Sequence, residues 1–84
     1  MMSVYSKVSK GLYDYEERCR NSDLIGYTWA EFLELANDDP VAVGYEIADM
    51  VHDLFPESFV SQSDNDKLVS TSVAVAQKWL MTLE

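Results

Sequence analysis

The chain has 84 residues, with 15 acidic and six basic side chains and a formal net charge of −9. This length predicts one domain over residues 1–84, and 48% hydrophobic residues argue against an intrinsically disordered chain. The single cysteine, Cys19, excludes an internal disulfide. Because no segment resembles a signal peptide or a bilayer-spanning helix, we expect a cytoplasmic protein that does not bind membranes.

The first predicted helix covers about residues 4–20. Ser3 is a suitable N-cap, and Asn21-Ser22 is a suitable stop. Gly11 should weaken the middle of this helix by roughly 1 kcal/mol relative to alanine. Its apolar residues repeat at helical spacing and are Val4, Val8, Leu12, Tyr15 and Cys19.

A short second helix is predicted after the turn that ends at Thr28. Thr28 and Glu31 form a capping box, in which the threonine hydroxyl accepts from a backbone N–H and the glutamate reaches back. The helix ends at Asn37-Asp38. Its buried residues are expected to be Trp29, Phe32, Leu33 and Ala36.

The third helix is predicted to begin with Asp39 as N-cap and Pro40 at the first helical position. Pro56 ends it, because the residue before a proline avoids the helical region. In the loop that follows, Phe59 and Val60 are expected to fold back on the core. The apolar stripe of the helix is Val43, Ile47, Met50, Val51 and Leu54.

The last helix is predicted over about residues 66–83, with Asp64 or Asn65 as its cap. A wide apolar face is typical of the central helix of a small bundle. We therefore predict an all-α fold, a compact four-helix bundle with a short second helix. The stripe of the last helix is Val69, Val73, Ala76, Leu80 and Leu83, widened by Leu68, Val75 and Trp79.

The acidic side chains are concentrated in the middle of the chain. Residues 21–66 hold eleven acids and no lysine or arginine, whereas residues 1–20 and 67–84 each carry a net charge of +1. Nucleic acid and anionic membranes would be repelled, and a basic protein would be attracted. The eleven acids are Asp23, Glu31, Glu34, Asp38, Asp39, Glu46, Asp49, Asp53, Glu57, Asp64 and Asp66.

On the third helix, Glu46, Asp49 and Asp53 lie three and four residues apart, opposite the apolar stripe. Each like-charged pair costs ~0.2–0.5 kcal/mol, a penalty that a cationic partner would relieve. Neighbouring carboxylates rise roughly 4.5–6 Å along the helix, which is broadly the spacing of neighbouring phosphates. Such a face could occupy a basic groove built for nucleic acid. The competing interpretation is an acidic surface that only keeps the protein soluble.

The predicted partner-binding residues are these three acids, two acids just before the third helix, two acids at the start of the last helix, and one tyrosine, since tyrosine is favoured at binding hot spots. Tyr27 is a second candidate anchor, and ordinary partial burial is the competing interpretation for both tyrosines. The predicted residues are Asp38, Asp39, Tyr45, Glu46, Asp49, Asp53, Asp64 and Asp66.

No pattern in the chain predicts catalysis, a metal site or a cofactor. His52 has no second histidine or cysteine at zinc-ligand spacing, and Asp64-Asn65-Asp66 lacks the glycine and glutamate of a calcium loop. There is no nucleophile elbow and no phosphate-binding glycine loop. We interpret His52 as a packing residue or part of the acidic rim, Cys19 as a core residue, and the protein as a non-enzyme without a cofactor.

Residues 25–36 and 46–80 resemble the immunity proteins of the colicin D type. Thr28-Trp29-Ala30-Glu31-Phe32 matches a Ser/Thr-x-x-Glu-Phe helix start, Phe55-Pro56 a later helix end, and residues 64–69 an acidic loop leading into the final helix. Members of this family are small, acidic, helical inhibitors that present carboxylates to the cationic site of a toxin nuclease. The tyrosine-rich first helix and Trp29 depart from the family pattern. The acids to which the resemblance assigns this role are Glu46, Asp49, Asp53, Asp64 and Asp66.

Three other functions remain open, as does the oligomeric state. A phage-encoded inhibitor of a host defence nuclease, of the anti-CRISPR or antirestriction kind, would use the same acidic face. A helical adaptor or oligomerisation module would carry its acidity incidentally. Acyl carrier proteins are also small, acidic and four-helical, but their modified serine stands in Asp-Ser-Leu, whereas Ser22 here stands between Asn21 and Asp23.

Overall fold

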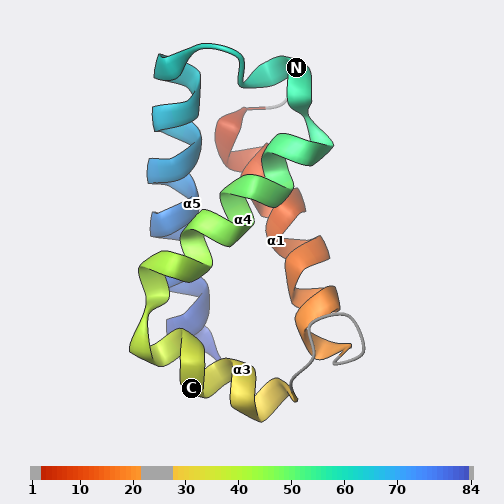
Figure 1. Ribbon diagram of the computed structural model, residues 1–84, viewed down its shortest axis with the longest axis vertical. Helices are drawn as coiled ribbons and strands as arrows, with labels where there is room; N and C mark the ends of the chain where they lie inside the picture. Colours follow the sequence, from red (N-terminus) through yellow and green to blue (C-terminus); the bar gives the residue numbers. More distant parts are fainter. Residues whose placement is uncertain (1–2, 22–27, 84) are drawn as a thin grey trace.

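The computed structural model describes residues 3–21 and 28–83. Within these ranges the predicted compact all-α bundle of four helices, with a short second helix, is confirmed (Figure 1). The radius of gyration is 12.6 Å, close to the roughly 12 Å expected for a compact chain of this length. The elements are α1 (Val4–Arg20), α3 (Trp29–Asp38), α4 (Pro40–Leu54), the 3₁₀ turn η1 (Pro56–Ser58) and α5 (Gln62–Thr82).

Helix α4 lies across the two other long helices, α1 and α5, and packs against both, while α3 closes one end of the bundle (Figure 1). The core forms where the three long helices meet. Val8 of α1, Ile47 and Val51 of α4, and Ala76 of α5 are completely buried there. The inner side of α4 is therefore committed to packing, and its outer side is left to solvent.

Two buried glycines set how closely α4 approaches its neighbours. A Cβ added at Gly44 would lie 2.6 Å from the Cα of Val73 on α5, and one added at Gly11 would lie 2.2 Å from a methyl carbon of Val51. The helices come this close because neither glycine has a side chain. The sequence indicated only the helix-propensity cost of Gly11 and missed its packing role.

The predicted caps of the first three helices are confirmed. The side chains of Ser3, Thr28 and Asp39 each accept a hydrogen bond from the backbone N–H three residues further on. The capping box between Thr28 and Glu31 is complete. These local hydrogen bonds satisfy N–H groups that the first turn of a helix leaves without a partner, so the helix starts follow directly from the sequence.

The predicted start of the last helix is wrong. Helix α5 begins at Gln62, and its N-cap is Ser61, whose Oγ accepts from the N–H of Asp64 at 3.1 Å. The predicted caps Asp64 and Asn65 lie inside the first turn, where the carboxylate of Asp64 favours the helix dipole. Because this turn contains no apolar residue, the helical periodicity becomes visible only from Leu68 onward.

The buried faces of α4 and α5 are rotated from the predicted stripes. On α4, Gly44 and Ala48 are buried, whereas Leu54 is 41% exposed. On α5, Ser72 is buried and Val69 only partly buried. Small residues face inward because neighbouring helices approach closely there, and hydrophobicity alone does not reveal that.

The segment between α4 and α5 places one of its two apolar side chains in the core. Phe59 is 2% exposed, as predicted, whereas Val60 is 79% exposed and the prediction for it is wrong. Outside a helix, consecutive side chains point in different directions. Lys7 lies 5.6 Å above the Phe59 ring and donates a hydrogen bond of 2.9 Å to Ser58, so this turn is also attached to α1.

Candidate partner-binding face

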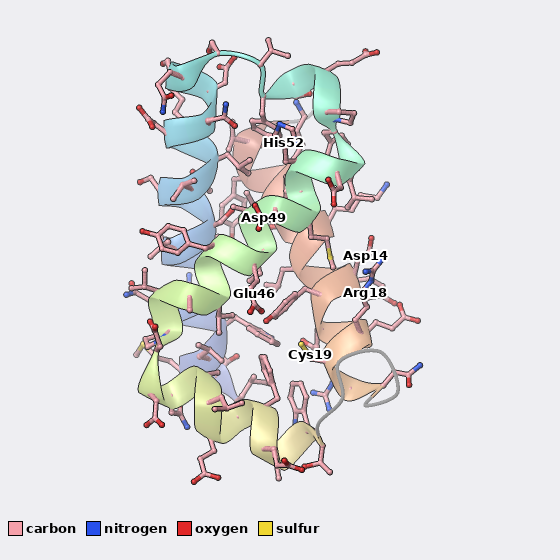
Figure 2. All side chains as sticks on the ribbon, viewed as in Figure 1. Asp14, Arg18, Cys19, Glu46, Asp49 and His52 are labelled. Atoms are coloured by element: carbon pink, nitrogen blue, oxygen red, sulfur yellow. The ribbon has the colours of Figure 1, made fainter. Side chains whose placement is uncertain are left out.

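The outer side of α4 carries the central residues of the predicted site. Tyr45, Glu46, Asp49 and Asp53 are all exposed, on the side of the helix opposite its buried residues. Figure 2 shows Asp49 directed outward from α4 and Glu46 directed toward α1. All four side chains are therefore accessible to a partner.

A shallow hollow between α1 and α4 brings four carboxylates together. Its lining includes Asp14 from α1 and Glu46, Asp49 and Asp53 from α4, with Arg18 as a single cation (Figure 2). Its volume is about 350 Å³. We call this space the acidic hollow, and its charged lining has a net charge of −3. Asp14 was missed from the sequence because only the packing of α1 on α4 brings it here.

The other basic side chains near this face are engaged elsewhere. Among the residues that the structure describes, the ion pair within 4 Å joins Arg20 to Glu16, at 3.0 Å on α1 itself. The Arg20 guanidinium also lies 4.2 Å from the centre of the Trp29 ring. Lys10 lies over the ring of Phe55. Among the described residues, the carboxylates of α4 therefore have no salt-bridge partner within 4 Å, and Arg18 is the cation that shares their hollow.

Tyr15 and Glu46 connect α1 to α4 through a hydrogen bond that the tyrosine hydroxyl donates to the carboxylate. Burial, and then this hydrogen bond, raises the pKa of Tyr15 well above its ordinary value, so the phenol keeps its proton. Its ring meets Phe32 and Trp79 edge to face, with centroid distances of 5.9 and 6.2 Å. The sequence placed Tyr15 in an apolar stripe and gave no sign of this polar contact.

Tyr15 and Glu46 also line a second hollow, enclosed by α1, α3 and α4, with a volume of about 270 Å³. We call it the apolar hollow. Its exposed rim includes Leu35, Asp39 and Glu46. Its buried floor is formed by Cys19, Phe32, Ala36 and Val43.

The thiol of Cys19 is part of that floor and is almost completely buried. Burial raises the pKa of this thiol to about 11. Since the thiolate is the reactive form of cysteine, a thiol that keeps its proton at neutral pH is a poor nucleophile. The chemistry available in the apolar hollow is thus binding of an apolar group close to two carboxylates.

The remaining predicted site residues lie at the two ends of the bundle. Asp38 is the last residue of α3, and Asp39, between α3 and α4, caps α4 by accepting a 3.2 Å hydrogen bond from the N–H of Ala42. Asp64 and Asp66 lie at the start of α5, at the end opposite α3 (Figure 1). The eight residues therefore form an elongated arrangement instead of one compact patch, and Tyr27 lies outside the described residues.

The imidazole of His52 is partly buried, with its ring 6.5 Å from that of Phe59. Among the described residues, no group of three histidine, cysteine or acidic side chains is arranged to hold a metal ion. No helix in those same ranges combines the length and the apolar character needed to cross a membrane.

Comparisons of the chain with protein-family models, with curated proteins and with solved structures gave no match. The resemblance to immunity proteins of the colicin D type thus stays a prediction. What the fold adds is the geometry of two hollows at the α1–α4 contact, which share Tyr15 and Glu46 in their lining.

Proposed function

We propose that this protein is a small acidic inhibitor that binds a basic nuclease or nucleic-acid-binding protein and covers its cationic site with the outer side of α4. An immunity protein for a nuclease toxin is the form that the resemblance favours. The observation that carries the proposal is the acidic hollow, where Asp14, Glu46, Asp49 and Asp53 meet around one depression with Arg18 as the one cation in its lining.

The dimensions of α4 suit an extended cationic groove. Asp39, Glu46 and Asp53 recur every seven residues, close to two helical turns, so they lie nearly in line. At 1.5 Å per residue the line is about 21 Å long, with roughly 10 Å between successive acids. That length allows contacts with several basic side chains of a partner.

Charge also gives the proposed interaction a kinetic signature. A face of one sign attracts an oppositely charged partner before contact, which raises the association rate, and dissolved salt weakens this attraction. Partner cations would also remove the repulsion among the α4 acids. The complex should therefore form quickly at low salt and more slowly at high salt.

The test is charge reversal at Glu46, Asp49 and Asp53, each replaced by lysine. Three changes of +2 shift the net charge from −9 to −3. A pull-down from the source cell at low and high salt, followed by mass spectrometry, identifies the bound proteins. We expect that the variant no longer binds or inhibits the nuclease, while its circular dichroism spectrum stays helical.

A matched control separates the position of the charges from their total. Replacing the exposed acids Glu17, Glu34 and Glu57 by lysine also brings the net charge to −3 but leaves the outer side of α4 intact. We expect this control to keep binding. Equal loss of binding in both variants would show that the overall charge alone causes the effect. Unchanged binding in the variant with three lysines on α4 would contradict the proposal.

A phage-encoded inhibitor of a host defence nuclease would use the same surface and respond to the same variants. The genes beside the coding sequence distinguish the two biological settings. A neighbouring toxin gene supports an immunity protein, and a cluster of phage genes supports counter-defence.

A helical adaptor or oligomerisation module is the second candidate, favoured by a different observation. A hollow of about 480 Å³ between α1 and α5 is lined largely by apolar groups, among them Tyr5, Leu12, Val75 and Trp79. An adaptor that used this hollow would keep its partner after charge reversal on α4. It would lose the partner when Val75 is replaced by lysine, which the same pull-down measures.

A further inference from the structure

The apolar hollow has an ordered polarity from floor to rim. Its floor contains the ring of Phe32 and the side chains of Ala36 and Val43, which are buried. Its rim carries the carboxylates of Asp39 and Glu46, which are exposed. A group that fills this space would have an apolar tip directed inward and a positive charge at the entrance.

The volume limits what can enter. A cavity of roughly 150 Å³ holds a benzene ring, whereas pockets for drug-sized ligands begin at about 300 Å³. The apolar hollow, at about 270 Å³, therefore fits a single leucine-, methionine- or phenylalanine-sized side chain better than a whole metabolite.

Glu46 is fixed at the entrance by its contact with α1. The Tyr15 hydroxyl donates a hydrogen bond to one carboxylate oxygen of Glu46, and the carboxylate has further lone pairs that can accept from other donors. Asp39 uses one oxygen to cap α4, which holds that carboxylate in place too. Both anions are positioned before any ligand arrives, which lowers the ordering cost of binding.

We propose that the apolar hollow receives one apolar side chain of the basic partner, next to a lysine or arginine of that partner that contacts Glu46 or Asp39. This inference rests on the proposed function and adds the chemistry of the recognised surface. Charge complementarity selects the occupant, because the rim is anionic and the partner is cationic. The acidic hollow then speeds association, and the buried anchor slows dissociation.

The closing experiment first uses a small probe and no partner. Isopentylamine has an apolar branched tip and a cation, and isopentyl alcohol has the same tip without the charge. We expect saturable NMR shifts of the Ala36, Ala42 and Val43 methyl groups with the amine. The alcohol should bind roughly three- to fivefold more weakly, the factor expected for one exposed ion pair.

Two variants assign the binding to this hollow. Ala42→Leu fills the hollow from α4, where Ala42 is partly exposed, and should abolish the shifts. Ala30→Leu is the matched control on the exposed side of α3 and should leave them unchanged. Asp39→Asn together with Glu46→Gln keeps the cap and the acceptor for Tyr15 but should remove the preference for the amine.

Measurements on the complex with the partner then test which group occupies the apolar hollow. Ala42→Leu should raise the dissociation rate of the nuclease complex by at least about tenfold with little change in association rate, whereas charge reversal on α4 should slow association. Nuclease binding that is lost on charge reversal but unchanged in Ala42→Leu would overturn this inference alone. If the amine binds but no nuclease partner is found, the proposed function is overturned, and the apolar hollow is instead a site for a free organic amine.

Discussion

Helix α4 has two neighbours, and its contacts with them are built differently. Toward α5, Gly44 faces the Cα of Val73, a backbone atom that cannot move unless the helix moves with it. Toward α1, Gly11 faces a methyl group of Val51, and the same contact contains the Tyr15–Glu46 hydrogen bond and both hollows that these two residues line. The α4–α5 contact fixes the helix, and the α4–α1 contact, which is less completely filled, has room for a binding site.

The largest predicted effect tests that difference directly. Gly44→Ala forces a Cβ against backbone, and overpacking of this kind costs about 2–3 kcal/mol. Alanine gains roughly 1 kcal/mol in helix propensity at either position, but the close contact at Gly11 is with a methyl group of Val51 instead of backbone, so the net cost of Gly11→Ala should be about 1 kcal/mol, below that of Gly44→Ala. Urea unfolding followed by circular dichroism measures both free energies.

A double-mutant cycle with Val51→Ala sharpens this result. Removing the Val51 methyl groups relieves the clash with the Cβ that Gly11→Ala introduces, so the Gly11→Ala and Val51→Ala effects should be coupled by about 1 kcal/mol. Gly44→Ala should show little coupling with Val51→Ala, because its clash is with Val73. Equal costs and equal couplings for the two glycines would remove the distinction between the contacts.

The second prediction concerns alkaline pH, which should act on the buried ionisable side chains of α1. The pKa of Cys19 rises from an ordinary 9.0 to about 11 in the folded protein, mainly through burial. A raised folded-state pKa gives stability that is complete below pH 9 and is lost as pH rises toward 11. We expect the free energy of unfolding to fall by about 2 kcal/mol over this interval.

Cys19→Ala identifies the source of that pH dependence. The variant has no thiol to ionise, so its unfolding free energy should change much less between pH 9 and pH 10. Above pH 10 a further loss should remain, because burial and the bond to Glu46 raise the pKa of Tyr15 as well, and Tyr15→Phe should remove it. An unchanged slope in Cys19→Ala would assign the effect to other groups.

The helix starts could be predicted from the sequence wherever a local hydrogen bond defines them. Ser3, the Thr28–Glu31 capping box and Asp39-Pro40 act within four residues of their own position. The start of α5 was predicted wrongly because its first turn is polar and several serines and acids there can cap a helix. Local chemistry determines a helix end only where one cap has no competitor nearby.

The candidate site could be predicted only in part, because half of it depends on tertiary contacts. Helical spacing alone places Glu46, Asp49 and Asp53 on one side of α4. Asp14 joins them through the packing of α1, and Tyr15 reaches Glu46 across 31 positions of sequence. The apolar hollow needs three helices at once, so no periodicity within one helix could reveal it.

The smallest predicted effect concerns the buried face of α5, next to the residue that Gly44 contacts. The Oγ of Ser72 is completely buried and has no hydrogen-bond partner among the described residues. A buried hydroxyl without a partner loses its hydration and gains nothing in return, so Ser72→Ala should stabilise the protein by about 1 kcal/mol. In a domain of this size that gain raises the midpoint of thermal unfolding by about 4–8 °C.

Ser70→Ala is the matched control, because Ser70 is exposed on the same helix and the change adds only the helix propensity of alanine, a few tenths of a kcal/mol. The excess of Ser72→Ala over Ser70→Ala isolates the cost of the buried hydroxyl. If the α4–α5 contact holds α5 in place, the Ser72 hydroxyl cannot move to find a partner, and the excess should be positive. A Ser72→Ala variant less stable than the wild type would show that the hydroxyl is bonded after all and that this contact is more adaptable than its glycine implies.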